Sequence, residues 1–358
     1  MADRKEEIIR LQNQIIRQMT DANLRSIGED LWGRNPRESP PQEEASPPPG
    51  YPAVPDVFAK GGQDAGKPEE KAKEAARAPE DIEKLKKELH SYIGLTVVKA
   101  EVESLINLVK VNRLRKEHGL PTEELSLHMV FSGNPGTGKT MIARLMSRIY
   151  HSLGILSKGH LIEVDRGGLV AGYVGQTAIK TGEVLQKALG GVLFIDEAYA
   201  LTTRGPQDYG QEAVETLLKA MEDMRDDLVV IVAGYVDLMN DFVHSNPGLE
   251  SRFNRFLYFP DYSVEDLLAI FNMRCEKAGY RLEDSAWDEL RIILKGESED
   301  NIGFGNARGV RNLFEQAVSR QANRLARQDT ITRDELMLLK KEDLQPPDEP
   351  DNGEDTAP

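Results

Sequence analysis

The sequence predicts an α/β domain built on a five-stranded parallel sheet, followed by a smaller all-helical domain. Short apolar runs rich in β-branched residues indicate strands at 128–132, 160–164, 192–195, 228–233 and 255–259. Helical patterns begin between these runs, near Lys139, Thr177, Gln211 and Asp237. Such alternation is typical of a parallel sheet that helices cover on both faces. After Pro260 only helical patterns follow, at 263–278, 285–294, 307–327 and 332–340.

The composition excludes several classes of protein. The 358 residues carry 45 Lys and Arg against 60 Asp and Glu, a net charge of −15, and include one cysteine. A lone Cys275 can form neither an intramolecular disulfide nor a cysteine cluster for zinc, which favours a reducing compartment. The longest apolar run, 228–235, is far shorter than the roughly 18 residues of a membrane-spanning helix. We therefore expect a soluble, cytoplasmic protein without a membrane span.

Both ends of the chain differ from its middle. Residues 1–33 predict an amphipathic helix, because apolar side chains recur at helical spacing. This helix either docks on the chain's own globular part or recruits a partner. Residues 34–80 hold ten of the 19 prolines and predict a disordered linker. Residues 342–358 hold seven acidic residues and no basic ones, which predicts a disordered acidic tail.

The middle of the chain divides into two predicted domains. Residues 81–262 form the α/β domain, which begins with a helical stretch broken around Ile93 and Gly94, and residues 263–341 form the helical domain. Residues 81–341 carry a net charge of only −5 and contain no basic run. Because nucleic-acid binding depends on positive charge along a surface, we expect no nucleic-acid partner.

A phosphate-binding loop follows the first predicted strand. The segment GNPGTGKT, residues 133–140, fits the pattern G-x-x-x-x-G-K-[ST]. Its glycines let backbone amides point at phosphate oxygens, and the helix that follows adds its positive N-terminal dipole. Lys139 is placed to neutralise the β- and γ-phosphates, and Thr140 can coordinate Mg²⁺. The residues expected to bind the nucleotide are Gly133, Asn134, Pro135, Gly136, Thr137, Gly138, Lys139, Thr140 and Met141.

A pair of carboxylates, Asp196 and Glu197, ends the apolar strand at 192–195. Such a pair alone could cap a helix. Downstream of a phosphate loop in a parallel sheet, it is better explained as a second element of the nucleotide site. Asp196 would then hold Mg²⁺ through water, and Glu197 would orient and deprotonate the attacking water. The two motifs together predict Mg²⁺-dependent ATP hydrolysis.

With both motifs in place, the chain resembles the AAA+ ATPases, and within them the CbbX (CbxX/CfxQ) type. This group includes the red-type Rubisco activases, the stage V sporulation protein K family, which the chain resembles most, and the ATPase domain of type VII secretion proteins. The resemblance covers about residues 89–339, through blocks such as GGVLFIDEAYAL, NPGLESRFNRFLYFPDYS and FGNARGVRNLFEQAVSRQANRL. It implies a P-loop AAA+ domain followed by a small helical lid domain.

The resemblance also implies roles for arginines. Arg252, in SRF, matches the arginine finger that reaches a neighbour's γ-phosphate, and Arg255 is a second candidate three residues on. Without the family pattern, an exposed arginine in a surface ion pair would be the simpler explanation for either. Arg308, in GNAR, matches the second-sensor arginine, which contacts the nucleotide from the helical domain. Arg311, one turn later, could fill that role instead.

Three further positions match family elements. Ile93 and Gly94 resemble the segment that packs against adenine. At the first-sensor position, where the wider superfamily has a polar Asn or Thr, this chain has Gly234 followed by Tyr235. The substrate pore loop is matched by Tyr173, Val174 and Gly175. A tyrosine between glycines could otherwise be a simple loop contact.

The resemblance therefore implies an oligomeric ring, a homo-hexamer, that hydrolyses ATP and remodels a protein client gripped by Tyr173. An alternative is an ATP-gated scaffold that assembles partners through its N-terminal helix without threading a client. Other chemistries find no pattern in the sequence. The six histidines show no HExxH or paired spacing for a metal.

Overall fold

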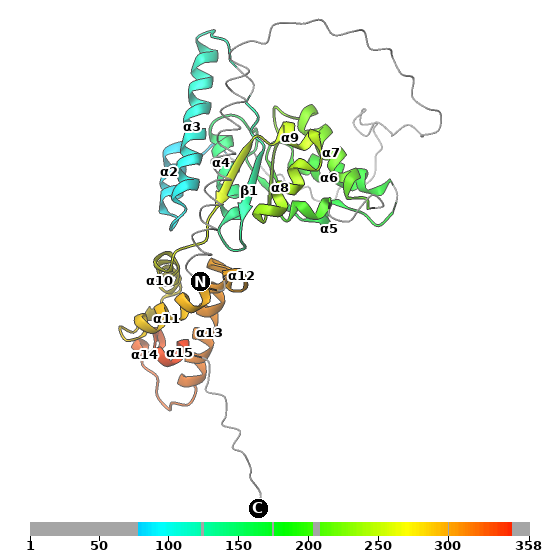
Figure 1. Ribbon diagram of the computed structural model, residues 1–358. Helices are drawn as coiled ribbons and strands as arrows, with labels where there is room; N and C mark the ends of the chain where they lie inside the picture. The colour runs from blue at the N-terminus through cyan, green and yellow to red at the C-terminus, as the bar shows by residue number, and fades with distance from the viewer. Residues whose placement is uncertain (1–77, 123–124, 174, 203–207, 300, 346–358) are drawn as a thin grey trace, which may run out of the picture. The chain divides into compact units, whose positions relative to one another are not determined.

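The computed structural model describes residues 78–345, except 123–124, 174, 203–207 and 300 (Figure 1). The predicted N-terminal helix at 1–33, the predicted linker up to residue 77 and residues 346–358 of the predicted tail lie outside this part. Within it, no helix is long and apolar enough to cross a membrane.

A five-stranded parallel sheet forms the centre of the first domain, as predicted. Its strands are β1 (Met129–Gly133), β2 (Leu161–Val164), β3 (Val192–Ile195), β4 (Val229–Gly234) and β5 (Arg255–Phe259). Their order is β2-β3-β4-β1-β5, and all four neighbouring pairs are parallel. Parallel strands all end at the same edge of the sheet, so the segments after β1, β3 and β4 come together there.

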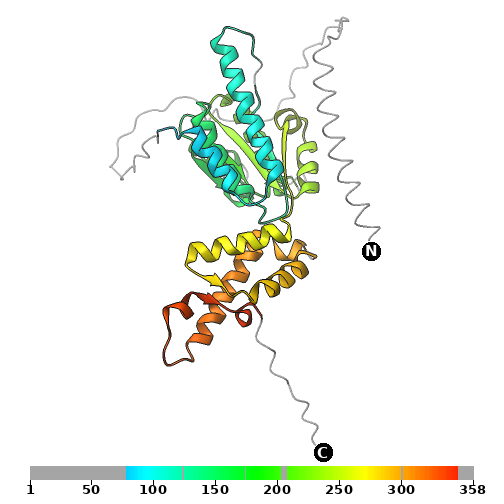
Figure 2. The same ribbon diagram turned by 90° about the vertical axis from the view of Figure 1, so that its left-hand side faces the viewer.

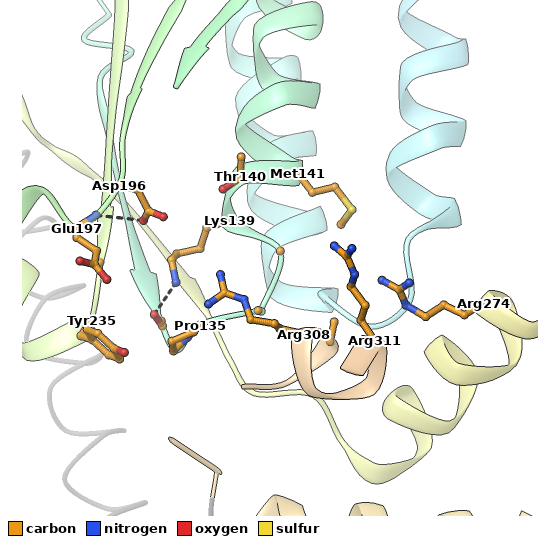
Figure 3. A pocket seen from close by; sticks show the side chains of 15 residues that line it. Pro135, Lys139, Thr140, Met141, Asp196, Glu197, Tyr235, Arg274, Arg308 and Arg311 are labelled. Carbon is orange, nitrogen blue, oxygen red and sulfur yellow. Dashed lines mark hydrogen bonds between the residues drawn. The ribbon is translucent and has the colours of Figure 1, made fainter. Parts of the chain in front are cut away.

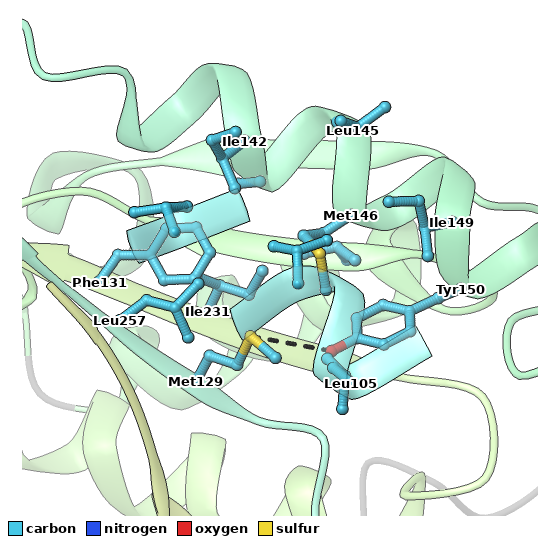
Figure 4. Packing of buried hydrophobic residues seen from close by; sticks show 14 of the residues in the cluster. Leu105, Met129, Phe131, Ile142, Leu145, Met146, Ile149, Tyr150, Ile231 and Leu257 are labelled. Atoms are coloured by element: carbon cyan, nitrogen blue, oxygen red, sulfur yellow. Dashed lines mark hydrogen bonds between the residues drawn. The ribbon is translucent and has the colours of Figure 1, made fainter. Parts of the chain in front are cut away.

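Helices cover one face of the sheet with a large apolar core. These are α2 (Ile82–Ser91), α3 (Thr96–Glu117) and α4 (Lys139–Ser152), and Figure 2 shows α2 and α3, in cyan, lying across this face. Side chains of α4 such as Ile142 and Met146 pack against Phe131, Ile231 and Leu257 of the strands (Figure 4). Burying α4 in this way fixes the end of the helix that carries the phosphate loop.

The opposite face is covered by the remaining elements of the first domain: α5 (Arg166–Leu169), α6 (Gln176–Ala188), the 3₁₀ helix η1 (Ala198–Leu201), α7 (Gly210–Asp223), α8 (Val236–His244) and α9 (Pro247–Arg252). Alternate strand residues serve the two faces. Phe194 belongs to the core under α4, whereas its neighbours Leu193 and Ile195 belong to this second core. Strands buried on both faces explain why their sequences are apolar throughout.

The break predicted around Ile93 and Gly94 separates α2 from α3. Gly94 and Leu95 both adopt positive φ angles, +62° and +56°, which no helix can continue through. Arg148 of α4 ties α2 to the phosphate-loop helix, since its guanidinium donates to Glu80 at 2.6 and 2.7 Å and to Glu88 at 2.8 Å. Glu80, assigned to the linker from the sequence, thus makes an ordered contact.

The second domain is helical, with a core of its own. It contains α10 (Val264–Ala278), α11 (Ala286–Glu299), α12 (Asn301–Phe304), α13 (Ala307–Leu325), α14 (Arg333–Met337) and α15 (Lys341–Leu344). A capping box between Ser263 and Asp266 starts α10, and Gly279 at φ +75° ends it. One departure from the predicted pattern is a pair of two-residue parallel strands, β6 (Arg281–Leu282) and β7 (Leu338–Leu339).

The predicted start of the acidic tail at residue 342 is too early. Asp343 is only 1% exposed, and Arg324 of α13 donates to its two carboxylate oxygens at 3.0 and 2.8 Å. Leu344 is buried in the core of the helical domain. Residues 342–345 therefore belong to that domain, because a buried ion pair and an apolar anchor outweigh the acidic, proline-rich composition that follows.

Candidate nucleotide site

The phosphate loop connects β1 to α4 through backbone angles that favour glycine. Gly136 and Gly138 have φ angles of +74° and +99°, in the region that residues with a Cβ avoid. Lys139 is the first residue of α4. Its Nζ donates to the carbonyl oxygens of Gly133 at 2.7 Å and Asn134 at 2.9 Å. The lysine is thus held at the mouth of the loop, where a phosphate oxygen would compete with these carbonyls.

The electrostatics around Lys139 suit an anionic ligand. Burial lowers the pKa of Lys139, the Asp196 carboxylate raises it, and the Arg308 guanidinium lowers it again. A buried ammonium group next to a second cation is stabilised when a polyanion arrives between them. The cavity therefore offers a triphosphate two positive charges, Lys139 of the loop and Arg308 of the helical domain.

Asp196 and Glu197 line the same cavity as Thr140 and Lys139. The backbone amide of Glu197 donates to Asp196 Oδ1 at 3.1 Å, and Glu197 itself has a φ of +50° at the start of η1. A positive φ at a non-glycine residue turns the chain sharply after β3. The turn brings both carboxylates to the edge of the sheet where β1 also ends, so hard oxygen donors suited to Mg²⁺ face the phosphate loop.

Three arginines of the helical domain complete the wall of this cavity of about 400 Å³. Arg308 and Arg311 come from α13 and Arg274 from α10 (Figure 3). The Nε of Arg311 also donates to Glu315 at 2.7 Å. The Nε of Arg274 is buried and has no hydrogen-bond partner among the described residues. Both candidates for the second-sensor role thus face the cavity, and the structure adds a third arginine.

Arg274 was not predicted from the sequence, although a signal was available. Arg274 lies between the buried residues Phe271 and Cys275 of an amphipathic helix. A charged residue on the border of an apolar face needs a partner or a ligand. Only the fold reveals that this border faces the phosphate loop.

A side chain at Gly234, the residue that matches the first-sensor position, would crowd its neighbours. A Cβ on Gly234 would lie 2.7 Å from Tyr199 Cδ1 and 2.8 Å from Met239 Sδ. Tyr235, the next residue, lines the cavity, and its ring centroid is 6.2 Å from that of Tyr199. The polar group available at this end of β4 is therefore the Tyr235 phenol.

The two candidate arginine fingers do not line this cavity. Arg252, at the end of α9, forms an ion pair with Glu222 of α7 and keeps 38% of its side chain exposed. The Nε of Arg255 donates to the carbonyl oxygen of Ser126 at 3.1 Å. Neither arginine is therefore placed to contact a nucleotide in the cavity of its own chain.

The expected adenine segment lies beside the phosphate loop but does not line the cavity either. A Cβ on Gly94 would lie 3.1 Å from the ring of Tyr262 and 3.2 Å from Asp266 Cγ. Ile93 packs on the core of the helical domain. Tyr262 in turn reaches the phosphate loop, since its hydroxyl donates to the carbonyl oxygen of Thr137 at 3.4 Å. Ile93 and Gly94 thus lie where the two domains meet.

The predicted pore loop is exposed. Tyr173 has 73% of its surface accessible, and its carbonyl oxygen accepts a hydrogen bond from the amide of Gln176 at 3.3 Å. Gly175, at φ +76°, precedes α6. Val174 lies outside the described residues. The geometry leaves the Tyr173 ring free to contact another molecule.

Comparisons with known proteins match both domains of the chain. Residues 129–261 match the ATPase family associated with various cellular activities (AAA), and residues 263–354 match the AAA lid domain. The chain is 41% identical to stage V sporulation protein K of Bacillus subtilis (strain 168) over 265 residues, which are 74% of this chain and 82% of that protein.

Two other relatives carry different names. Protein CbbX of Cereibacter sphaeroides is 46% identical over 76% of this chain and 87% of its own length. The chloroplastic ribulose bisphosphate carboxylase/oxygenase activase of Cyanidioschyzon merolae (strain NIES-3377 / 10D) is 45% identical over 70% and 87%. The resemblance predicted from the sequence is confirmed. The chain belongs to the AAA family of ATPases, with the lid domain of that family and with relatives among the stage V sporulation protein K and CbbX proteins.

Proposed function

We propose that the chain is the subunit of a homo-hexameric ring that couples Mg-ATP hydrolysis to the remodelling of a protein client. One observation carries the proposal. The phosphate loop, both carboxylates and Arg308 meet in one cavity, whereas Arg252 lies outside it, half-buried and ion-paired with Glu222. An arginine is the usual stabiliser of charge in phosphoryl transfer. Because Arg252 does not line the cavity of its own chain, we infer that it acts on the cavity of a neighbouring subunit in a ring.

The residues of the cavity divide the chemistry of hydrolysis among them. Lys139 binds the β- and γ-phosphates, and Thr140 with Asp196 would hold Mg²⁺, which neutralises the charge on these phosphates. Glu197 orients the attacking water and accepts its proton. Arg308 contacts the γ-phosphate from the lid domain, so that loss of the phosphate releases the lid. We assign the Tyr235 phenol to positioning water, in place of the absent polar residue at 234.

Two features support a protein client. Tyr173 is a large, exposed side chain on a glycine-flanked loop, suited to gripping a polypeptide. One relative is named an activase of ribulose bisphosphate carboxylase/oxygenase, so its target is itself a protein. The net charge of −5 over residues 81–341 argues against nucleic acid.

The single cysteine of the chain leads us to place the ring in a reducing compartment, the cytoplasm.

A crosslinking experiment tests the client. A photoreactive residue replaces Tyr173 in the full chain carrying Glu197→Gln, which retains ATP. With ATP we expect crosslinks to a polypeptide other than the chain itself, lost when ADP replaces ATP. The matched control places the same probe at Ile179 of α6, which is 51% exposed but outside the loop. We expect no crosslinks to the client from that position.

The scaffold alternative makes the opposite prediction for Tyr173. If the chain threads its client, Tyr173→Ala abolishes remodelling while ATP hydrolysis continues, and Tyr173→Phe retains both because the aromatic ring remains. A Tyr173→Ala variant with full cellular activity would show that the chain assembles partners without threading. If the wild-type chain hydrolyses ATP no faster than the Glu197→Gln variant, ATP-driven remodelling is refuted.

A further inference from the structure

Three polar side chains from distant parts of the chain form one hydrogen-bonded unit beside the phosphate loop. We call Asn134, Asp261 and Asn306 the interdomain relay. Asn134 Nδ2 donates to both carboxylate oxygens of Asp261, at 3.0 and 2.9 Å. Asn306 Nδ2 donates to Asp261 Oδ1 at 2.8 Å. Asp261 is thus the acceptor that the two asparagine side chains share.

Each residue of the interdomain relay belongs to a different segment of the chain. Asn134 is in the phosphate loop, directly before Pro135 and Gly136. Asp261 lies two residues after β5, on the segment that leads into the lid domain. Asn306 directly precedes α13, the helix that carries Arg308 into the cavity. The relay therefore joins the loop that holds the phosphates to the helix that presents an arginine to them.

The side-chain hydrogen bonds of Asn306 explain an asparagine at a position where the backbone conformation favours glycine. It is 5% exposed, with φ +54° and ψ −128°, a conformation that glycine adopts far more readily. Asparagine is a favoured N-cap residue, yet this side chain makes no hydrogen bond to its own helix. Instead Oδ1 accepts from the Tyr262 amide at 3.0 Å, and Nδ2 also donates to Pro135 O at 3.2 Å.

The backbones on either side of the relay are also in direct contact. The amide of Ala307 donates to the carbonyl oxygen of Gly136 at 3.3 Å. A Cβ on Gly136 would lie 2.1 Å from the carbonyl oxygen of Gly305 and 3.0 Å from the amide nitrogen of Arg308. The first turn of α13 thus rests on the apex of the phosphate loop, and a shift of the loop must move that turn or break these contacts.

We propose that Asn306 is a positioning residue for ATP hydrolysis, which sets the place of Arg308 relative to the phosphates through the interdomain relay. The inference rests on the role proposed for Arg308 and deepens it. Asn306 does not itself face the phosphates. It fixes the start of α13 against Pro135 and Asp261, and Arg308 follows only two residues later.

Substitution by glycine separates the side chain of Asn306 from its backbone. Asn306→Gly keeps the positive φ and relieves its strain, so a purely conformational role predicts a fully active enzyme. The relay predicts that kcat falls on the order of tenfold, because small misplacements of a catalytic group are costly. The KM for ATP should change by less than about threefold, since the phosphate loop that binds the ground state stays intact.

A double-mutant comparison identifies the residue through which Asn306 acts. In an Arg308→Ala background, Asn306→Gly should change kcat by less than about twofold, because there is no arginine left to position. The matched control is Thr332→Gly in the same lid domain. It removes the capping box of α14 and should lower the thermal midpoint without changing kcat at the assay temperature.

The outcomes are distinct. Wild-type kcat in Asn306→Gly, or losses that multiply in the double variant, would overturn the relay while leaving Arg308 in its role. Wild-type kcat in Arg308→Ala would overturn that role and the relay with it. If Asn306→Gly does not fold, Asp261→Ala carries the same comparison, because it removes both oxygens that accept from Asn134 and Asn306.

Discussion

Mixing two inactive variants tests whether each active site is shared between subunits. Lys139 lies in the cavity of its own chain, whereas Arg252 lies outside that cavity. Lys139→Ala therefore spoils the site of its own chain but still offers Arg252 to a neighbour. Arg252→Ala does the reverse. Loss of an arginine finger lowers kcat by about 10³ to 10⁵, so each pure variant should hydrolyse ATP at the assay background.

The recovery expected on mixing follows from this geometry. In an equal mixture that assembles at random, a site is complete when its own subunit carries Arg252→Ala and the neighbour that faces it carries Lys139→Ala. Each condition holds half of the time, so about one quarter of the sites are complete in a ring with one contact per site. Phosphate release at saturating Mg-ATP should thus reach about 25% of wild type at equal proportions and fall toward either pure variant.

In the control, a chain carrying both Lys139→Ala and Arg252→Ala replaces the Lys139→Ala chain. Mixed with Arg252→Ala, it should give no recovery, because no subunit in that mixture carries Arg252. An activity that never exceeds the sum of the two pure variants, at any ratio, would refute a shared site. If Arg255→Ala, and not Arg252→Ala, is inactive alone and regains activity when mixed with Lys139→Ala, the finger is Arg255. That outcome would require the Arg255 Nε to leave the Ser126 carbonyl.

Two further predictions concern stability. Asp343→Ala removes the buried carboxylate from Arg324 and leaves it only the exposed Glu342 as an ion-pair partner, which should lower the unfolding free energy by about 3 kcal/mol. A chain ending at Gln345, in contrast, should unfold as wild type does and keep basal ATP hydrolysis. Burial lowers the pKa of His128 from 6.5 to about 4, and its Nδ1 accepts from the Val230 amide at 3.0 Å, so the neutral ring is favoured. Because the unfolded chain binds the proton more tightly, stability is full above pH 6.5 and declines toward pH 4, by about 3 kcal/mol.

Both are checked by denaturant unfolding. For the C-terminal end, equal losses in Asp343→Ala and in the truncated chain would place the tail within the folded domain. For the pH effect, His128→Asn keeps an acceptor for the Val230 amide but cannot titrate, so its stability should change less between pH 6.5 and 4 than that of wild type. Equal slopes in the two proteins would show that other groups cause the acid sensitivity.

Local sequence patterns were sufficient for most of the fold. Each strand was predicted to within one residue at either end, because strands buried on both faces are apolar throughout. The phosphate loop was equally clear, since its chemistry requires Gly136, Gly138 and Lys139 at fixed spacing. These features depend on neighbours in sequence, and neighbours in sequence are what a pattern describes.

The parts that the sequence left hidden depend on contacts between distant residues. Asn306 and Asp261 are ordinary polar residues until the fold brings them to Asn134. In the sequence, Arg274 is one arginine of an amphipathic helix, and only the structure shows that it faces the cavity at the phosphate loop. Asp343 stood in an acidic stretch typical of disorder, and only Arg324, nineteen residues away in sequence, explains its burial.

The packing around Gly234 limits how this site can change by mutation. Any side chain at 234 would crowd both Tyr199 and Met239, so these two side chains must shift before residue 234 can offer a polar group to the nucleotide. Asn or Thr at 234 would therefore require Tyr199 and Met239 to move or to be replaced by smaller residues. Variation near the attacking water is more accessible at Tyr235, which already lines the cavity.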